Sequence, residues 1–162
     1  MNKLVESIIE PILGEQKDIK KVIAVYPGRF QPFGPHHKAV YDFLRKKFDD
    51  VYIVTSDIKK LPRHPLNFRE KQSHMSKMGV PKSKISKERN PYTPKNLLKK
   101  FDKDTTAVVF VVGTKDASRL SGGKYFQDYN TNKSNMVGFE EHGYVMIAPH
   151  ITVSAGGMEV SG

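Results

Sequence analysis

The sequence contains no cysteine among its 162 residues, and it has no apolar run long enough to cross a lipid bilayer. Without cysteine the chain can form no disulfide, no thiolate metal site and no cysteine nucleophile. Its first residues, MNKLVESIIEPIL, mix acidic with apolar side chains and show no cleavage pattern of a signal peptide. We therefore expect a short helix there, a cytoplasmic location and no membrane contact.

Acidic residues are also scarce compared with basic ones. The sequence has 17 Asp and Glu against 27 Lys and Arg, which gives a formal net charge of +10. Such a surplus favours polyanionic partners, among them nucleotides, phosphorylated metabolites and nucleic acid. Because the lysine pairs are spread along the chain, as on solvated helix faces, charge alone does not predict a nucleic acid partner.

The sequence does contain an alternation of strand and helix patterns, without repeats or a linker, and we expect residues 1–162 to form a single domain. Helices are indicated by apolar spacing, as for Val40, Phe43, Leu44 and Phe48, or by caps such as Asn67 with Glu70. The polar stretch 121–135 is expected to be a mobile loop. The predicted strands are 21–26, 50–57, a short edge strand at 84–86, 105–113 and 144–149, and the predicted helices are 38–48, 68–78, 94–101 and 115–120.

This alternation predicts a doubly wound α/β fold with a parallel sheet. In such sheets ligands bind beyond the carboxyl ends of the strands, where the strand order reverses. The rule directs attention to the loops 27–37, 55–66 and 113–120.

The first of these loops carries the densest chemical signal, GRFQPFGPHH at residues 28–37. Gly28 at a strand end lets the backbone approach a ligand closely, and Arg29 offers a planar fork for phosphate. The following helix start is an anion site, where a histidine can donate to a phosphoryl oxygen. Each residue alone fits an ordinary surface turn, but their combination favours a phosphate site.

GRFQPFGPHH resembles the HxGH signature of the nucleotidyltransferase superfamily, and it is most similar to the GRFQPFHxGH of nicotinamide-nucleotide adenylyltransferases. Residues 28–33 match that pattern in full, and His37 falls on its second histidine. Two positions depart from it, because Gly34 replaces the first histidine and His36 replaces the glycine. The resemblance implies a Rossmann-like fold and a possible homo-oligomer.

The resemblance further implies an enzyme that transfers an adenylyl group from ATP to a small phosphorylated acceptor, with nicotinamide mononucleotide as the first candidate. Pyrophosphate is released, the acceptor phosphate attacks the α-phosphorus directly, and Mg²⁺ enters with ATP and needs few protein ligands. Lys59 and Arg119 are candidates for the β,γ-phosphates. The implied catalytic residues are His37 and Arg29, and the implied nucleotide-binding residues are Gly28, Phe30, Gln31, Gly34, His36, Gly113, Asp116 and Ser161.

Two further features of the resemblance also fit an ordinary structural role, and a third lies at the end of the sequence. Asp116 follows Gly113 in a Gly-x-Asp-like element and could accept from a ribose hydroxyl, or it could merely cap a helix. Arg69 and Glu70 resemble a Glu-Arg pair of the family or form a solvated helical turn. Residues 160–162 look like the start of a late Ile-Ser-x-Thr-x-x-Arg motif at a helix N-terminus. Because the sequence stops there, we expect a domain that is truncated at its C-terminus and catalyses poorly.

Other functions stay open at this point. Within the same class the acceptor could be flavin mononucleotide or phosphopantetheine, or the reaction could be cytidylyl transfer to a polyol phosphate. From another class, a non-catalytic nucleotide-binding or nucleic-acid-binding module fits the net charge of +10 and the altered HxGH motif.

Overall fold

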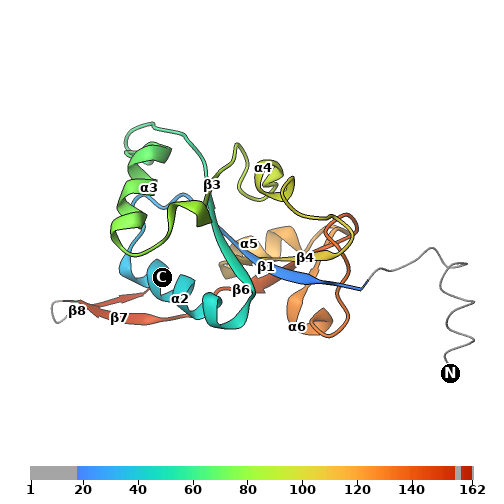
Figure 1. Ribbon diagram of the computed structural model, residues 1–162. Helices are drawn as coiled ribbons and strands as arrows, with labels where there is room; N and C mark the ends of the chain where they lie inside the picture. Colours follow the sequence, from blue (N-terminus) through green and yellow to red (C-terminus); the bar gives the residue numbers. More distant parts are fainter. Residues whose placement is uncertain (1–17, 156–157, 162) are drawn as a thin grey trace, which may run out of the picture.

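The computed structural model describes residues 18–155 and 158–161 (Figure 1). None of the helices in these ranges is long and apolar enough to cross a membrane. The predicted N-terminal helix falls on residues outside them. In chain order the elements are β1 (Lys21–Pro27), α2 (Pro35–Lys47), β2 (Asp50–Thr55), α3 (Phe68–Lys77), a 3-10 turn (Lys82–Lys84), β3 (Ile85–Lys87), α4 (Lys95–Leu98), β4 (Thr106–Val112), α5 (Thr114–Leu120), β5 (Phe126–Asp128), α6 (Tyr129–Asn132), β6 (Gly143–Ile147), β7 (Thr152–Ala155) and β8 (Met158–Ser161).

Six of these strands form one parallel sheet in the order β3-β2-β1-β4-β6-β5. The chain starts at β1, moves outward to β3, and then returns to place β4 on the other side of β1. The strand order therefore reverses between β1 and β4, which is the position where α/β sheets bind ligands. This sheet confirms the predicted doubly wound, Rossmann-like α/β fold.

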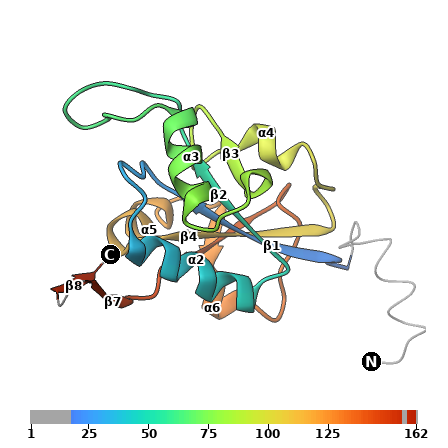
Figure 2. The ribbon, with the colours of Figure 1, turned by 60° about the vertical axis from the view of Figure 1, so that its left-hand side comes forward.

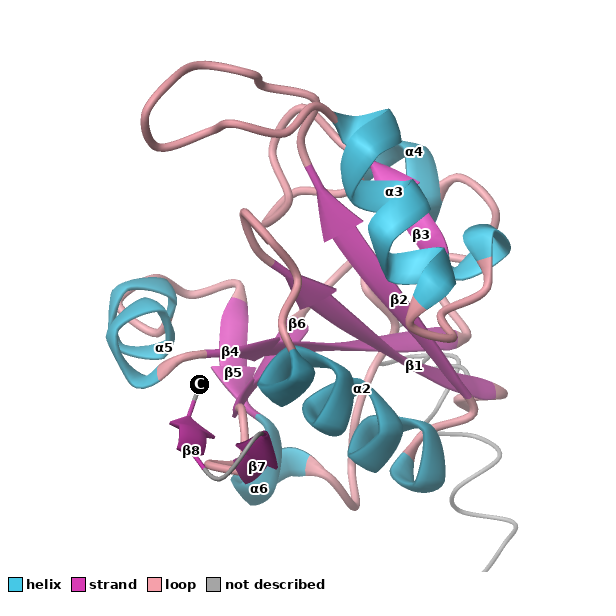
Figure 3. Cartoon of the chain, turned by 90° about the vertical axis from the view of Figure 1, so that its left-hand side faces the viewer, coloured by secondary structure: helices cyan, strands magenta, loops and turns pink. Residues whose placement is uncertain are grey.

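Helices cover both faces of the sheet (Figures 2 and 3). On one face α2, α3 and α6 contribute Leu44, Met75 and Tyr129 to the largest apolar cluster. On the other face α4 contributes Leu97 to a second cluster. All seven residues of β4 are buried, as the continuous apolar run at 105–113 predicts.

Helix α2 begins three residues before the predicted start, because Pro35 occupies its first position and Gly34 its N-cap. Its apolar stripe contains Tyr41 in the core, whereas Phe43, which we expected at core spacing, is 41% exposed. The three basic residues of its last turn suit the helix dipole.

The cap of α3 is the one that the sequence predicts. The Asn67 side chain accepts the backbone N–H of Glu70 at 2.8 Å, and the Glu70 carboxylate accepts the N–H of Asn67 at 3.1 Å. This reciprocal capping box gives Glu70 a structural role. Gly79, at φ +100°, follows the helix in the left-handed conformation that glycine tolerates.

The prediction of a mobile loop at 121–135 is wrong, because that stretch contains the edge strand β5 and the short helix α6. The ring of Phe126 packs edge-on against Phe110, with centroids 5.2 Å apart. Asp128 accepts the backbone N–H of Thr131 at 2.8 Å and so caps α6. These tertiary contacts and the cap outweigh the polar local composition.

The chain's last described strands pair as an antiparallel hairpin, β7 with β8. Ser161 is the last residue of β8, and its backbone pairs with Thr152. The predicted helix start at 160–162 is therefore wrong for residues 160 and 161, which lie in a strand, while residue 162 is outside the described residues.

Candidate functional site

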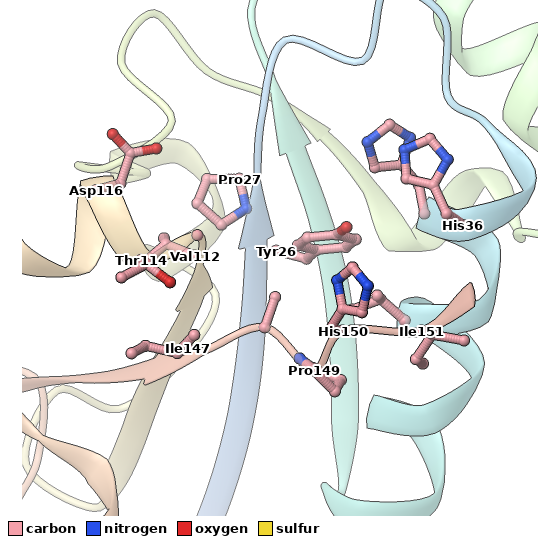
Figure 4. A pocket seen from close by; sticks show the side chains of 14 residues that line it. Tyr26, Pro27, His36, Val112, Thr114, Asp116, Ile147, Pro149, His150 and Ile151 are labelled. Atoms are coloured by element: carbon pink, nitrogen blue, oxygen red, sulfur yellow. The ribbon is translucent and has the colours of Figure 1, made fainter. Parts of the chain in front are cut away.

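A cavity of about 500 Å³ opens at the carboxyl ends of β1 and β4, where the strand order reverses (Figure 4). Figure 4 shows His36 at the start of α2 on one side of it and Asp116 and Thr114 at the start of α5 on the other. Tyr26 and the segment after β6 form the wall between them. The lining consists of Tyr26, Pro27, His36, His37, Val40, Val112, Gly113, Thr114, Asp116 and residues 147–151.

The turn between β1 and α2 is held by its own aromatic side chain. Phe30 has a φ of 47°, in the left-handed region that non-glycine residues rarely adopt, and the residue is 5% exposed. A Cβ added at Gly28 would lie 2.9 Å from the Phe30 ring. Glycine is therefore needed at position 28 because Phe30 folds back onto it.

Two further contacts fasten this turn to its surroundings. The Gln31 side chain donates to the carbonyl of Leu66 and accepts the N–H of the same residue, both at 2.8 Å. The Gly28 N–H donates to the carbonyl of Val54 at 3.1 Å. Gln31 thus joins the turn to the long loop between β2 and α3.

A buried lysine that the sequence analysis does not single out supports the same turn. Lys71 of α3 is 1% exposed, and its ammonium donates to Thr55 Oγ1 at 2.8 Å and to the carbonyl of Arg29 at 3.2 Å. Burial lowers its pKa, and the nearby carboxylate of Asp57 opposes that shift. The helical spacing of Lys71 with Met75 on the apolar face is the signal that could have revealed it.

The imidazole of His37 is oriented by the helix it opens. Its Nδ1 accepts the backbone N–H of Gly34 at 2.8 Å, so the neutral ring carries its proton on Nε2. Burial, with a smaller contribution from His36, lowers the pKa of His37 to about 4. No hydrogen-bond partner of Nε2 is found among the described residues, and His37 therefore presents a neutral donor at the cavity.

On the opposite wall, Asp116 has partners of its own. Its carboxylate accepts the hydroxyl of Tyr92 at 3.0 Å and lies 3.2 Å from the guanidinium of Arg119. Gly113, rather than Asp116, occupies the N-cap of α5, and a Cβ added at Gly113 would meet no atom within 4 Å. Asp116 is therefore held at the cavity rim by a tyrosine and an arginine.

The structure brings four of the predicted residues together around the cavity, namely His36, His37, Gly113 and Asp116. Arg29 is exposed on the turn, and Lys59 forms an ion pair with Glu70 at 2.9 Å. Outside the described lining are Gly28, Arg29, Phe30, Gln31, Gly34, Lys59 and Arg119. Of Ser161 the structure describes the backbone in β8 only.

The sequence analysis did not predict the wall between these two sides of the cavity. Residues 147–151 line it, together with Tyr26 at the end of β1. The segment is anchored where Ala148 N–H donates to the carbonyl of Val112 at 2.7 Å. Applying the carboxyl-end rule to the strand predicted at 144–149 would have identified it.

The described residues contain no group of three or more His, Asp or Glu side chains arranged to hold a metal ion. Among the described residues that line the cavity, Asp116 is the sole carboxylate. A magnesium ion here would be held mainly by the phosphate oxygens of a nucleotide, and Asp116 is the described carboxylate that could add a protein ligand.

The described residues form a Rossmann-like sheet with a cavity at its switch point, and His37 lies beside that cavity at the start of α2. The family model described as cytidylyltransferase-like matches residues 25–154, and the chain belongs to that family. This membership confirms the resemblance to the nucleotidyltransferase superfamily. No curated protein matches the sequence significantly.

Three solved structures are similar to this chain. One is a putative nicotinate-nucleotide adenylyltransferase from Vibrio parahaemolyticus, with 18% identity, a TM-score of 0.49, and coverage of 80% of this chain and 77% of that one. Another is a bifunctional NMN adenylyltransferase/ADP ribose pyrophosphatase from Francisella tularensis, with 19% identity, a TM-score of 0.48, and coverage of 77% of this chain and 37% of that one. The third is a bifunctional NMN adenylyltransferase/ADP ribose pyrophosphatase from Francisella tularensis complexed with AMP and a manganese ion. It has 19% identity and a TM-score of 0.47, and the match covers 80% of this chain and 37% of that one.

Proposed function

We propose that this protein transfers a nucleotidyl group from a nucleoside triphosphate to a phosphate-bearing acceptor. ATP is the proposed donor and nicotinamide mononucleotide the proposed acceptor. The family membership and the GRFQPF segment at residues 28–33 support the proposal.

The observation that carries the proposal is the state of His37. A neutral imidazole whose Nδ1 is occupied by the Gly34 N–H can offer only its Nε2–H to the cavity. Such a donor stabilises negative charge that builds up on a phosphoryl oxygen, and it requires no reorganisation when the charge appears. The start of α2, where the backbone N–H groups lack helical partners, adds a favourable dipole.

The reaction needs no protein nucleophile. An oxygen of the acceptor phosphate forms a bond to the α-phosphorus of ATP, and the bond from that phosphorus to the α,β-bridging oxygen breaks. The electron pair leaves with pyrophosphate. The protein positions the two phosphates and stabilises charge, with His37 at the transferring group and Arg29 as the proposed second cation.

Magnesium is part of the proposal as the partner of the triphosphate. The ion would neutralise charge on the phosphate oxygens and on the departing pyrophosphate. Asp116 is the described cavity residue that could reach it or a water bound to it.

The direct test measures pyrophosphate release by the protein with ATP, Mg²⁺ and nicotinamide mononucleotide. CTP with a polyol phosphate, and ATP with flavin mononucleotide or phosphopantetheine, are run in parallel. We expect release with ATP and nicotinamide mononucleotide and a loss of about 100-fold or more in kcat in His37→Ala, since one such donor contributes roughly 10²–10³-fold.

The matched control is His142→Ala. His142 lies before β6, at the opposite end of the sheet, and its Nδ1 contacts the carbonyl of Tyr125 at 3.0 Å. Its loss should leave turnover unchanged. Full activity of His37→Ala would refute the role of His37, and no release with any pair would favour a nucleotide-binding module.

A further inference from the structure

The carboxylate of Asp116 is held at the cavity rim by a residue from a distant segment of the chain. Tyr92 lies between β3 and α4, and its hydroxyl donates to Oδ2 of Asp116 at 3.0 Å. The other carboxylate oxygen, Oδ1, lies 3.2 Å from Nη2 of Arg119, three residues further along α5. Because a carboxylate oxygen can accept more than one hydrogen bond, both oxygens keep the capacity to accept from a ligand.

Of these two partners, Tyr92 is the better anchored. The Arg119 side chain is 63% exposed, and an exposed ion pair within one helix restrains a carboxylate only weakly. The ring of Tyr92 lies under the Arg119 guanidinium, with 5.2 Å between that group and the ring centroid. Tyr92 also packs against a small apolar cluster made of Val112, Ala117 and Val145. One tyrosine therefore orients both charged side chains of α5.

The hydrogen bond between Tyr92 and Asp116 has a fixed direction. Burial, and then the hydrogen bond to the Asp116 carboxylate, raise the pKa of Tyr92, and the charge of Arg119 opposes this shift. The phenol therefore stays protonated at neutral pH and donates to the carboxylate, which keeps its own acceptor capacity on the cavity side.

A carboxylate at this place in the cavity suits one part of a nucleotide. Asp116 is the only anionic side chain among the described residues of the lining, and it stands across the cavity from the start of α2 (Figure 4). An anion repels phosphate groups but accepts strongly from hydroxyl groups, which the sugar supplies. If the phosphates lie at His37, a nucleotide that spans the cavity brings its sugar toward Asp116.

We propose that Tyr92 is a positioning residue, which orients the Asp116 carboxylate to accept a ribose hydroxyl and so makes the site selective for ribonucleotides over deoxyribonucleotides. This inference rests on the proposed function and adds to it the sugar that the donor must carry. A carboxylate that is oriented before the ligand arrives loses less conformational freedom on binding, so the hydroxyl contributes more to affinity.

Calorimetric binding of a non-hydrolysable ATP analogue and of its 2′-deoxy and 3′-deoxy forms, each with Mg²⁺, tests the inference. Wild type should bind at least one deoxy form about tenfold or more weakly than the ribose form, since hydrogen bonds to charged groups contribute that much. Tyr92→Phe keeps the ring under Arg119 and removes only the hydroxyl. We expect it to reduce this preference at least threefold, through weaker binding of the ribose form.

Equal binding of all three analogues by the wild type, or a smaller reduction in Tyr92→Phe, would overturn the inference. An unchanged preference together with a weaker apparent affinity for Mg²⁺ would assign Asp116 to the ion and would also overturn it. The ribose preference in a protein that releases no pyrophosphate would contradict the proposed reaction but not the role of Tyr92.

A double variant shows whether Tyr92 acts through Asp116. Asp116→Asn keeps the shape of the side chain and removes its charge. If Tyr92 only orients this carboxylate, Tyr92→Phe should weaken binding of the ribose analogue in the wild-type background, but by less than twofold in the Asp116→Asn background. An equal loss in both backgrounds would show that the two residues act independently, and the inference would be wrong.

Tyr125→Phe is the matched control, because it also removes a phenol hydroxyl with a single acceptor, the carbonyl of Phe139 at 2.6 Å. Tyr125 precedes β5, whose first residue pairs with the first residue of β6 at the amino end of the sheet. We expect Tyr125→Phe to bind all three analogues as the wild type does. Thermal unfolding of both variants is measured alongside, and a Tyr92→Phe that loses only thermal stability would show that Tyr92 merely packs.

Discussion

Histidine chemistry at the residue scale depends on where the proton sits. The Gly34 N–H occupies Nδ1 of His37, and burial keeps the ring neutral far below the usual histidine range. His37 can therefore donate from Nε2 without carrying charge near a phosphate.

The same burial makes the stability of the protein depend on pH. Well above the ordinary histidine pKa of about 6.5, the folded and unfolded chains both hold His37 neutral. As the pH falls toward 4, the unfolded chain takes up a proton that the folded protein does not, because the pKa of His37 in the fold is about 4. Wild-type protein should lose about 2–3 kcal/mol of unfolding free energy over this range from His37.

Urea unfolding of wild type and His37→Gln between pH 7 and pH 4 measures this contribution. The wild type should lose more stability than the variant, by about the stated amount. Parallel curves for the two proteins would show that His37 titrates normally in the fold.

Substituting Lys71 tests whether its hydrogen bonds to the turn between β1 and α2 are needed for activity. Lys71→Met fills the same buried space with an apolar chain, so we expect a small change in stability. It removes the ammonium that binds the Arg29 carbonyl and Thr55, and kcat/KM for ATP should fall at least tenfold.

Lys77→Met is the matched control, because Lys77 lies on the same helix and is exposed. We expect Lys77→Met to have the same kcat/KM for ATP as the wild type. Activity of Lys71→Met within twofold of wild type would remove the positioning role of Lys71.

Residue identities in the turn were predictable to different degrees. His36, His37 and Asp116 line the cavity, as the motif and the strand rule predict, whereas α2 begins three residues before its predicted start. No local pattern predicts that the Phe30 ring packs against Gly28. Nor does one predict that the Gln31 side chain forms a hydrogen bond with Leu66. Such contacts join residues distant in the sequence.

At the scale of secondary-structure elements, the amino end of the sheet is held by charge. Asp50, which begins β2, lies 2.6 Å from the Lys21 ammonium and 2.7 Å from that of Lys84. These hydrogen bonds lower the pKa of Asp50, and they raise the pKa of both lysines.

Replacing Asp50 with asparagine should cost about 1 kcal/mol of unfolding free energy at pH 7 and leave kcat unchanged, because the site is at the other end of the strands. The contribution is present above the ordinary aspartate pKa and is lost as the pH falls through the lowered one. The difference between wild type and variant in urea unfolding should therefore shrink below about pH 4. A constant difference down to pH 2 would contradict this account.

Gly138 marks a close approach of two backbone segments. A Cβ there would overlap the carbonyl oxygen of Lys103 and lie 2.6 Å from the carbonyl carbon of Asp104. Gly138→Ala should cost about 3 kcal/mol or more, as overpacking against backbone that cannot yield.

Thermal unfolding measures that cost, and Gly123→Ala is the control because a Cβ at Gly123 would meet nothing within 4 Å. A Gly138→Ala melting temperature equal to that of the control would show that the segments can separate freely.

Elements with a strong period were predictable, and elements created by tertiary contact were not. The buried strands β1, β2, β4 and β6 appear as apolar runs, and α3 appears through its capping box. The short β5 and α6 lie in a polar stretch and depend on packing against the sheet, which the local composition does not encode.

For the whole molecule, the order of strands places the site. The cavity lies where the strand order reverses, between β1 and β4, and residues from four separate segments line it. This architecture was predictable as a class. The carboxyl-end rule would have directed attention to residues 147–151, but the sequence does not show that the strand before them lies beside β4.

The central claim is that the switch-point cavity holds a nucleoside triphosphate with its α-phosphate against the His37 Nε2–H. A crystal structure with Mg²⁺ and a non-hydrolysable ATP analogue tests it most directly. The account predicts an α-phosphate oxygen about 2.7–3.1 Å from His37 Nε2. Nucleotide bound elsewhere on the protein, or phosphates placed away from His37, would contradict it.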